Sequence, residues 1–153
     1  MYVSTKTIGG FSTCFRQWKA KGTHCKFLHG YAMEFHMEFE SETLDERNWV
    51  QDFGFLSRTE FKMDGYQLKE WFKYMFDHTT IIAYDDPYKE LFKGMADEGL
   101  IQLRIMDNTG CEKFAELVYS IVSLALKYEQ GEMVKLRKVT CIETPFNTAS
   151  YEG

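Results

Sequence analysis

The chain has 153 residues, which is enough for a sizeable core, and we expect residues 1–153 to form a single domain. Its formal net charge of −5 argues against a nucleic-acid partner, because phosphate binding needs a basic surface. It contains no run of about 18 apolar residues, so we expect no membrane-spanning segment. The four cysteines form no Cys-x-x-Cys pair and no apolar signal segment opens the chain, so we expect a cytoplasmic protein with reduced thiols.

The first part of the chain predicts two strands. Residues 2–15 alternate weakly, and Gly9-Gly10 indicates a bulge or turn inside this strand. Residues 31–40 alternate strictly, which is typical of a strand with one buried face. Its apolar set is Tyr31, Met33, Phe35, Met37 and Phe39. His29 shares the parity of this set, and Gly30 allows close approach to the backbone.

Apolar residues at helical spacing predict two main helices. The first runs from about residue 55 to 75, with Gly65 as a candidate break in it. Its apolar positions are Leu68, Trp71, Phe72 and Met75. The second, over 111–127, has a continuous apolar stripe that indicates packing in a core. The stripe consists of Phe114, Leu117, Val118, Ile121, Val122 and Ala125.

Shorter elements lie between and after these helices. A turn at Asp85-Asp86-Pro87 precedes a short helix over 88–98 and an edge strand over 100–105. A second convincing strand follows over 133–144, and the segment 147–151 is expected to pair at a sheet edge. Alternation along that strand places Val134, Leu136, Thr140 and Ile142 on one side.

Cys25 is the strongest candidate for catalysis. A catalytic thiol needs access and either a lowered pKa or an adjacent base. Cys25 lies in a polar segment between His24 and Lys26, four residues before His29. The alternative is a small buried hydrophobic residue, and we assign that role to the other three cysteines. They are Cys14, Cys111 and Cys141.

Asp77-His78 is the second candidate, at the end of the first predicted helix. A carboxylate beside an imidazole can fix its tautomer and keep it basic, which suits a proton shuttle near neutral pH. The alternative is a cationic histidine that only stabilises a helix C-terminus.

The motif Cys25-x3-His29-Gly30, entering an alternating strand, resembles the 6-pyruvoyl tetrahydropterin synthase and 6-carboxytetrahydropterin synthase family. Asp52-Phe53, Asp77-His78 and Glu143-Thr144 also resemble motifs of that family, and the order of elements agrees over nearly the whole chain. The resemblance implies the α+β tunnelling fold, an antiparallel sheet with two main helices on one face, which oligomerises into a barrel. It marks 82–107 as an elaboration of that fold, and we assign no function to it here.

The resemblance also implies roles for individual residues. Cys25, Asp77 and His78 correspond to the family's catalytic set. Glu143 corresponds to a carboxylate that accepts two hydrogen bonds from a pterin, with Thr144 beside it, because two donors in a plane need a bidentate acceptor. Glu112, near the start of the second helix, is assigned a lesser role in substrate binding.

The resemblance fails at the family's metal site, which consists of three histidines that bind zinc. Phe15 and Tyr31 occupy two of these positions, and only His29 remains. Catalytic zinc takes three protein ligands and keeps one open position. The candidate substitutes are Cys14, His24 and Tyr31, whereas the parity of His36 sends it to the opposite face. We expect zinc to be absent or weakly bound.

In family terms, the chain is a lyase acting on 7,8-dihydroneopterin triphosphate to give a 6-carboxy or 6-pyruvoyl tetrahydropterin, in the branch that supplies 7-deazaguanine (queuosine) precursors. One alternative is a metal-free relative that binds a pterin or purine without turnover. Another is an enzyme with altered substrate, in which Tyr31 or His29 does the acid–base work. The resemblance implies a trimer-based homo-oligomer, a homo-hexamer, with Glu143 and Cys25 of one site from different subunits or at their boundary.

Overall fold

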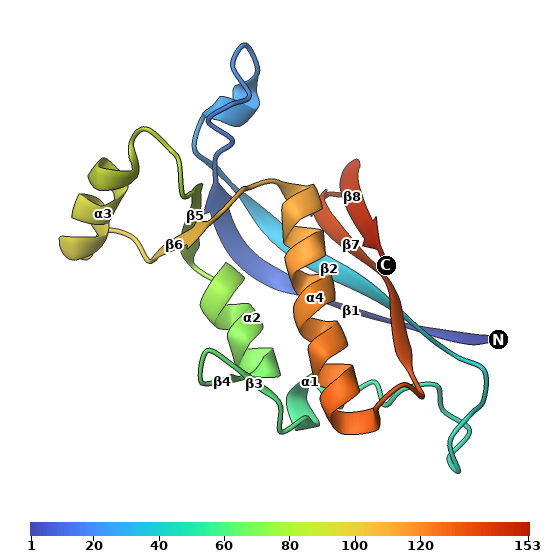
Figure 1. Cartoon of the computed structure of the whole chain (residues 1–153). Helices are drawn as coiled ribbons and strands as arrows, with labels where there is room; N and C mark the ends of the chain where they lie inside the picture. The colour runs from blue at the N-terminus through green and yellow to red at the C-terminus, as the bar shows by residue number, and fades with distance from the viewer.

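In the computed structural model, which describes residues 1–153, two long antiparallel strands form the centre of a six-stranded sheet (Figure 1). They are β1 (Tyr2–Phe15) and β2 (His29–Ser41), as the alternation predicts. The register slips between Ile8 and Phe11, so the predicted bulge at Gly9-Gly10 is confirmed. Gly10 has a φ of 78°, which glycine adopts without strain.

The sheet order is β6-β5-β1-β2-β7-β8. β7 (Lys135–Thr144) pairs antiparallel with β2, and β8 (Asn147–Glu152) pairs antiparallel with β7, so the C-terminal segment lies at a sheet edge as expected. The other side of the sheet differs from the expectation of an antiparallel sheet. β5 (Thr79–Ala83) runs parallel to β1, and β6 (Leu103–Met106) runs parallel to β5. All five residues of β5 are buried, so no alternation marks it in the sequence.

Two helices cover one face of the sheet, which confirms the predicted α+β architecture (Figure 1). They are α2 (Leu68–Phe76) and α4 (Cys111–Gln130). Between them and the sheet lies an aromatic core, in which the rings of Phe35 and Phe76 are 4.7 Å apart and those of Phe76 and Phe114 are 5.7 Å apart. Burial of each such ring contributes roughly 1.5–3 kcal/mol relative to exposure. None of the helices is both long enough and apolar enough to cross a membrane.

The predicted helix over 55–75 is wrong in its first half. Only α1 (Phe55–Arg58) is helical there, and it is followed by a two-stranded hairpin, β3 (Lys62–Met63) and β4 (Tyr66–Gln67). Asp64 and Gly65 connect the two strands with φ angles of 51° and 83°. An Asp-Gly pair with both φ angles positive is the preferred two-residue hairpin turn. Gly65 therefore belongs to a hairpin and does not interrupt a helix.

The side assignment along β7 is also wrong in its second half. Glu38 pairs with Lys138 but Phe39 pairs with Leu136, so Arg137 is an extra residue that reverses the parity of the strand. Beyond it Val139 and Cys141, rather than Thr140 and Ile142, are fully buried toward the helices. This bulge turns Glu143 toward the helix-covered face of the sheet.

The elaboration over 82–107 contains the predicted short helix and edge strand, as α3 (Lys89–Asp97) and β6. Figure 1 shows α3 standing beside the sheet, away from α2 and α4. The segment before β2 also has local structure, because residues His24–Lys26 form one turn of 3-10 helix, η1.

Candidate functional site

The ends of β1, β2 and β7 meet at the N-terminus of α4. Phe15 and His29 are direct partners across β1 and β2, and Tyr31 lies two residues farther along β2. The ring of Tyr31 is 5.5 Å from that of Phe15 and 4.9 Å from that of His29. The three positions at which the resemblance implies zinc ligands therefore converge, although only one of them carries a histidine.

Tyr31 and His29 form a hydrogen-bonded pair, with 3.2 Å between the Tyr31 hydroxyl and Nε2 of His29. Burial raises the pKa of Tyr31 to about 12, and the negative charge and hydrogen bonding of Glu143 add to the shift. The thiols of Cys25 and Cys111 contribute further in the same direction. The phenol is therefore protonated at neutral pH and can donate a hydrogen bond to a neighbouring oxygen or nitrogen.

Glu143 is held by Cys111, whose predicted role is only that of a small buried side chain. Sγ of Cys111, at the first position of α4, donates to Oε2 of Glu143 across 3.3 Å. The pKa of Cys111 is raised by its contact with Cys141, then by burial and by Glu143, so Cys111 remains a neutral donor. No sequence signal predicts this contact, because it depends on the bulge in β7 that turns Glu143 toward α4.

Cys25 lies on η1 at the same end of the sheet and is exposed. Its backbone N–H donates to Oγ1 of Thr23 (3.2 Å), and its carbonyl accepts from the N–H of Gln17 (2.8 Å). Its thiol makes a smaller electrostatic contribution than Glu143 to the raised pKa of Tyr31. No hydrogen bond joins the Cys25 thiol to Tyr31 or Glu143 within one chain.

We expect Cys25 to alkylate faster than the other three cysteines at neutral pH. Cys111 and Cys141 are buried, and burial raises the pKa of the half-buried Cys14, so each is less accessible or less ionised. Brief iodoacetamide treatment followed by peptide mass mapping measures the order of labelling. Equal or slower labelling of Cys25 would contradict its assignment as the reactive thiol.

The Asp77-His78 pair is anchored to β1. Oδ1 of Asp77 accepts from the backbone N–H of Ser12 (3.0 Å) and lies 3.1 Å from Nδ1 of His78. The Ser12 hydrogen bond and then His78 hold the pKa of Asp77 below its usual value. His78 adopts a φ of 57°, in the left-handed region that non-glycine residues rarely occupy, and its N–H donates to the Ser12 carbonyl (2.7 Å). The carboxylate is thus fixed, while the imidazole side chain is 75% exposed.

Within one chain, no hydrogen bond or ion pair joins this pair to Cys25. Ser12 pairs with Ala32 and Phe15 pairs with His29, so the anchoring point of Asp77 is three residues from the end of the strand. At about 3.3 Å per residue this is a separation of about 10 Å along β1. The chain therefore joins Tyr31 to His29 and Glu143, with Cys25 at the same end of the sheet, and no hydrogen bond or ion pair links Asp77 or His78 to them.

Thr144 follows Glu143 in the sequence, and Glu112 follows Cys111. The structure places these two residues in different local environments. Oγ1 of Thr144 accepts from the backbone N–H groups of Phe146 and Asn147, at 3.2 and 3.1 Å, and closes the turn between β7 and β8. Glu112 is exposed in the first turn of α4, where a carboxylate interacts favourably with the helix dipole. Their roles in substrate binding stay predictions.

The residues at the converging positions do not fit a zinc ion. Phe15 has no donor atom, and the raised pKa of Tyr31 makes its phenol harder to deprotonate for coordination. No group of three or more His, Cys, Asp or Glu side chains in residues 1–153 could hold a metal ion. Acid–base chemistry at this site would therefore use its own side chains.

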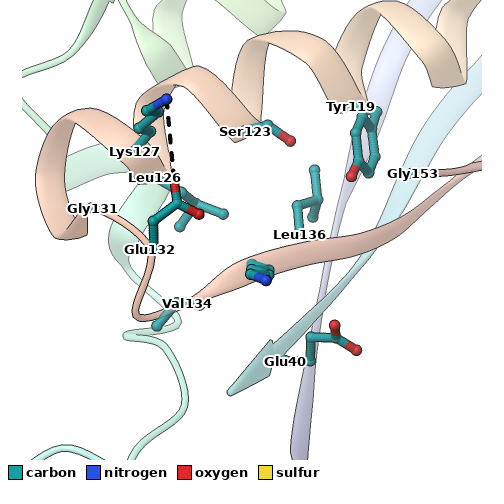
Figure 2. Close-up of a pocket in the computed structure, with 11 residues that line it drawn as sticks. Glu40, Tyr119, Ser123, Leu126, Lys127, Gly131, Glu132, Val134, Leu136 and Gly153 are labelled. Atoms are coloured by element: carbon teal, nitrogen blue, oxygen red, sulfur yellow. Dashed lines mark ion pairs between the residues drawn. The ribbon is translucent and has the colours of Figure 1, made fainter. Parts of the chain in front are cut away.

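The pocket in Figure 2 is a separate feature. It lies between the C-terminal half of α4 and the beginning of β7, where Lys127 and Glu132 form an ion pair at 4.0 Å. None of the candidate residues lines it, and it lies at the opposite end of α4 from Cys111. We do not assign the candidate chemistry to this pocket.

Comparisons with solved structures agree on the fold. An uncharacterized protein from Wolinella succinogenes superposes with a TM-score of 0.80 at 20% identity, covering 99% of this chain and 98% of that one. The 6-pyruvoyl tetrahydropterin synthase of Caenorhabditis elegans gives 0.56 at 21% identity, with coverage of 100% and 97%. The 6-pyruvoyl tetrahydropterin synthase of Plasmodium falciparum gives 0.63 at 11% identity, with coverage of 100% and 99%.

Sequence comparisons identify the family. No curated protein sequence matches the chain. The profile of the family described as 6-pyruvoyl tetrahydropterin synthase matches residues 5–153, which is nearly the whole chain. The α+β fold, with two helices on one face of the sheet, agrees with that match. The chain belongs to the 6-pyruvoyl tetrahydropterin synthase family.

Proposed function

We propose that the protein is a lyase that acts on 7,8-dihydroneopterin triphosphate without the help of zinc. Enzymes of the family act on pterin substrates, form oligomers and typically depend on zinc. The observation that carries the proposal is the presence, at one end of the sheet, of an exposed thiol, a protonated phenol paired with an imidazole, and a carboxylate. Those are Cys25, Tyr31, His29 and Glu143.

Glu143 binds the pterin ring in this proposal. Its carboxylate now accepts from the thiol of Cys111, a weak donor that the 2-amino and ring N–H groups of a pterin can replace. Hydrogen bonds to an ionised carboxylate are roughly twice as strong as neutral ones. The exchange therefore favours the bound pterin over the free site.

The segment around Cys25 supplies positive charge for the phosphates of the substrate. Lys21 and Lys26 are exposed and form no ion pair, although the chain as a whole carries a net charge of −5. Phosphate groups bind well to such cations, especially when several lie close together. This local charge supports a phosphorylated pterin rather than an uncharged one.

Acid–base chemistry on the side chain of the substrate then falls to Cys25 and Tyr31. The Cys25 thiolate takes a proton from a side-chain carbon and returns one later. The Tyr31 hydroxyl donates a hydrogen bond to the adjacent substrate oxygen, and His29 exchanges a proton with Tyr31 across their 3.2 Å contact. This pair occupies the position at which zinc polarises the substrate in the family.

We also propose that the site is completed by a second copy of the chain. The Asp77-His78 pair is anchored but faces solvent, and its anchor, Ser12, lies about 10 Å along β1 from Phe15, the partner of His29. Residues Tyr2–Ile8 of β1 pair only with β2, which leaves a long open strand edge that oligomerisation can cover. In a trimer-based homo-oligomer, which we propose to be a homo-hexamer, His78 of one copy would relay the proton for Cys25 of the next.

Subunit complementation tests this shared site. Cys25→Ala and His78→Ala are each expected to lower turnover by about a hundredfold or more. Co-expression of the two variants should restore activity at roughly a quarter of the sites, because random assembly pairs an intact Cys25 with an intact His78 that often. Turnover of the purified mixed oligomer measures the recovery. Cys25→Ala co-expressed with Cys25→Ala/His78→Ala is the control, and no recovery is expected there. A mixed oligomer as inactive as that control excludes a site shared in this way.

The proposed reaction is tested by incubating the purified protein with dihydroneopterin triphosphate, with a chelator or with added zinc, and identifying the products by mass. Formation of a 6-carboxy or 6-pyruvoyl tetrahydropterin that is insensitive to chelators is the expected result. Stoichiometric zinc, lost together with activity in His29→Ala, would contradict the metal-free mechanism. The 6-carboxy product would support our assignment to the branch that makes 7-deazaguanine precursors.

The four free thiols fit the reducing cytoplasm in which we place the protein.

A second candidate function is binding of a pterin or purine without turnover. The loss of two of the three family zinc ligands, at Phe15 and Tyr31, favours it. The exposed thiol of Cys25 and the anchored Asp77-His78 pair favour the lyase, because a binding protein has no use for them. Tight binding of dihydroneopterin triphosphate, recovered chemically unchanged after prolonged incubation, would establish this second candidate.

A further inference from the structure

We propose that the turn at Asp85-Asp86, in the elaboration over 82–107, positions the catalytic segment of residues 16–26 and thereby sets the place of Cys25. The elaboration then has a function in the reaction without contacting the substrate. The catalytic meaning of this role rests on the function proposed for Cys25, whereas the physical attachment is independent of it.

The sheet topology brings the two segments together. β5 runs parallel to β1, with Ile81 beside Phe15, so the C-terminal ends of both strands lie at the same end of the sheet. Residues 16–26 follow β1 directly, and Asp85-Asp86 follows the last residue of β5, Ala83. Parallel pairing thus makes two stretches, about 70 residues apart in the chain, neighbours at the end of the sheet.

Asp86 holds the start of the catalytic segment through Arg16. Its Oδ2 lies 2.8 Å from Nε of Arg16, and the two side chains are 0% and 17% exposed, respectively. The other carboxylate oxygen, Oδ1, accepts from the backbone N–H of Tyr88 (2.9 Å), which fixes the carboxylate in its own turn. The Arg16 guanidinium also lies 5.5 Å from the centroid of the Tyr88 ring. The Asp86 carboxylate is the fully buried charge of this pair, and a buried charge without its ionic partner is strongly unfavourable, so the two side chains are held together.

Asp85 holds the next two residues. Its Oδ1 accepts from Nε1 of Trp18, and its Oδ2 pairs with Nζ of Lys19, each at 3.0 Å. These two contacts, with the Trp18 hydrogen bond first, hold the pKa of Asp85 below its usual value, so it remains ionised at neutral pH. Three of the first four residues after β1 are therefore bound to a single turn of the elaboration.

The attachment reaches Cys25 through one intervening residue. The N–H of Gln17, between Arg16 and Trp18, donates to the Cys25 carbonyl (2.8 Å). A hollow of about 340 Å³ separates the segment from the elaboration and from the residues before α4. Polar contacts therefore hold the segment in place: those of Asp85 and Asp86, and two with Thr109, whose carbonyl accepts from Nε2 of Gln17 (3.3 Å) and whose Oγ1 donates to the Arg16 carbonyl (2.7 Å).

Hydrogen exchange measured by mass spectrometry on the full-length protein tests the attachment. We expect Asp85→Ala and Asp86→Asn to accelerate amide exchange over residues 16–27 by about tenfold or more, with α4 and β2 unchanged, because the segment opens locally. Glu90→Gln is the matched control, since it removes one carboxylate of the same elaboration from an exposed pair with Lys93. Turnover should fall about tenfold in both test variants, mainly in kcat, and Asp85→Glu should recover part of it.

The possible outcomes separate this proposal from the proposed function. Unchanged exchange over 16–27 in the folded variants overturns the attachment, whatever the activity of the protein. If Asp86→Asn does not fold, the result for the more exposed Asp85 decides. Faster exchange with unchanged kcat overturns the positioning role. If the wild-type protein shows no turnover, the proposed function fails. The attachment is then tested by amide exchange and by the rate at which Cys25 is alkylated. This alkylation rate should change in Asp85→Ala but not in Glu90→Gln.

Discussion

Replacing Cys25 with alanine is expected to lower kcat by about 10²–10⁴-fold, because a positioned acid or base typically contributes that much to a proton transfer. Binding of the substrate should change little. Cys25 is exposed on a short turn, and its backbone contacts with Thr23 and Gln17 do not involve the thiol. The variant should therefore keep its fold and its pterin affinity, and lose only the chemical step.

Cys14→Ala is the matched control for this measurement. It removes a half-buried thiol from β1, one residue before Phe15. Burial raises the pKa of this Cys14 thiol and makes it a poor nucleophile. Single-turnover rates and equilibrium pterin binding of the two variants separate chemistry from binding. A Cys25→Ala protein that turns over at the rate of Cys14→Ala would remove the thiol from the mechanism and leave Tyr31 and His29 as the acid–base groups.

The second large effect is expected at Glu143. Glu143→Gln replaces one acceptor oxygen by an NH₂ group that faces the donors of the pterin. Each hydrogen bond to a charged group contributes about 1.5–3 kcal/mol, and 1.4 kcal/mol corresponds to a tenfold change in affinity. We therefore expect pterin affinity to fall by about 10²-fold or more, as measured by fluorescence quenching or calorimetry with a reduced pterin.

Glu112→Gln provides the comparison, because it neutralises an exposed carboxylate close to the same site. Glu112 lies in the first turn of α4, next to Cys111, which contacts Glu143. Its effect on affinity should stay below about threefold, as for an exposed charge near a helix end. Equal losses in the two variants would point to a general electrostatic effect of this region. An unchanged affinity in Glu143→Gln would mean that the pterin binds elsewhere.

Local sequence determined the central elements of the fold. The strict alternation of β2 and the continuous stripe of α4 each follow a period set by backbone geometry, so both could be predicted without knowing any partner. The polar neighbours of Cys25 likewise indicated an exposed thiol, and the motifs with Asp77-His78 and Glu143-Thr144 indicated the family. Even the hairpin at Asp64-Gly65 had a local signal, which the helical spacing of the residues after it obscured.

Pairing between distant segments decided the rest. The extra residue at Arg137 arises from the register of β7 against β2, and a second irregularity, against β8, lies between Ile142 and Thr144, so strand register decides that Glu143 faces Cys111. The contacts of Asp85 and Asp86 with the segment before Cys25 exist because β5 lies parallel to β1. The sequence alone thus determined which side chains are candidates for the chemistry. The tertiary structure decided which of them meet, because strand register and strand direction depend on partners that no local pattern describes.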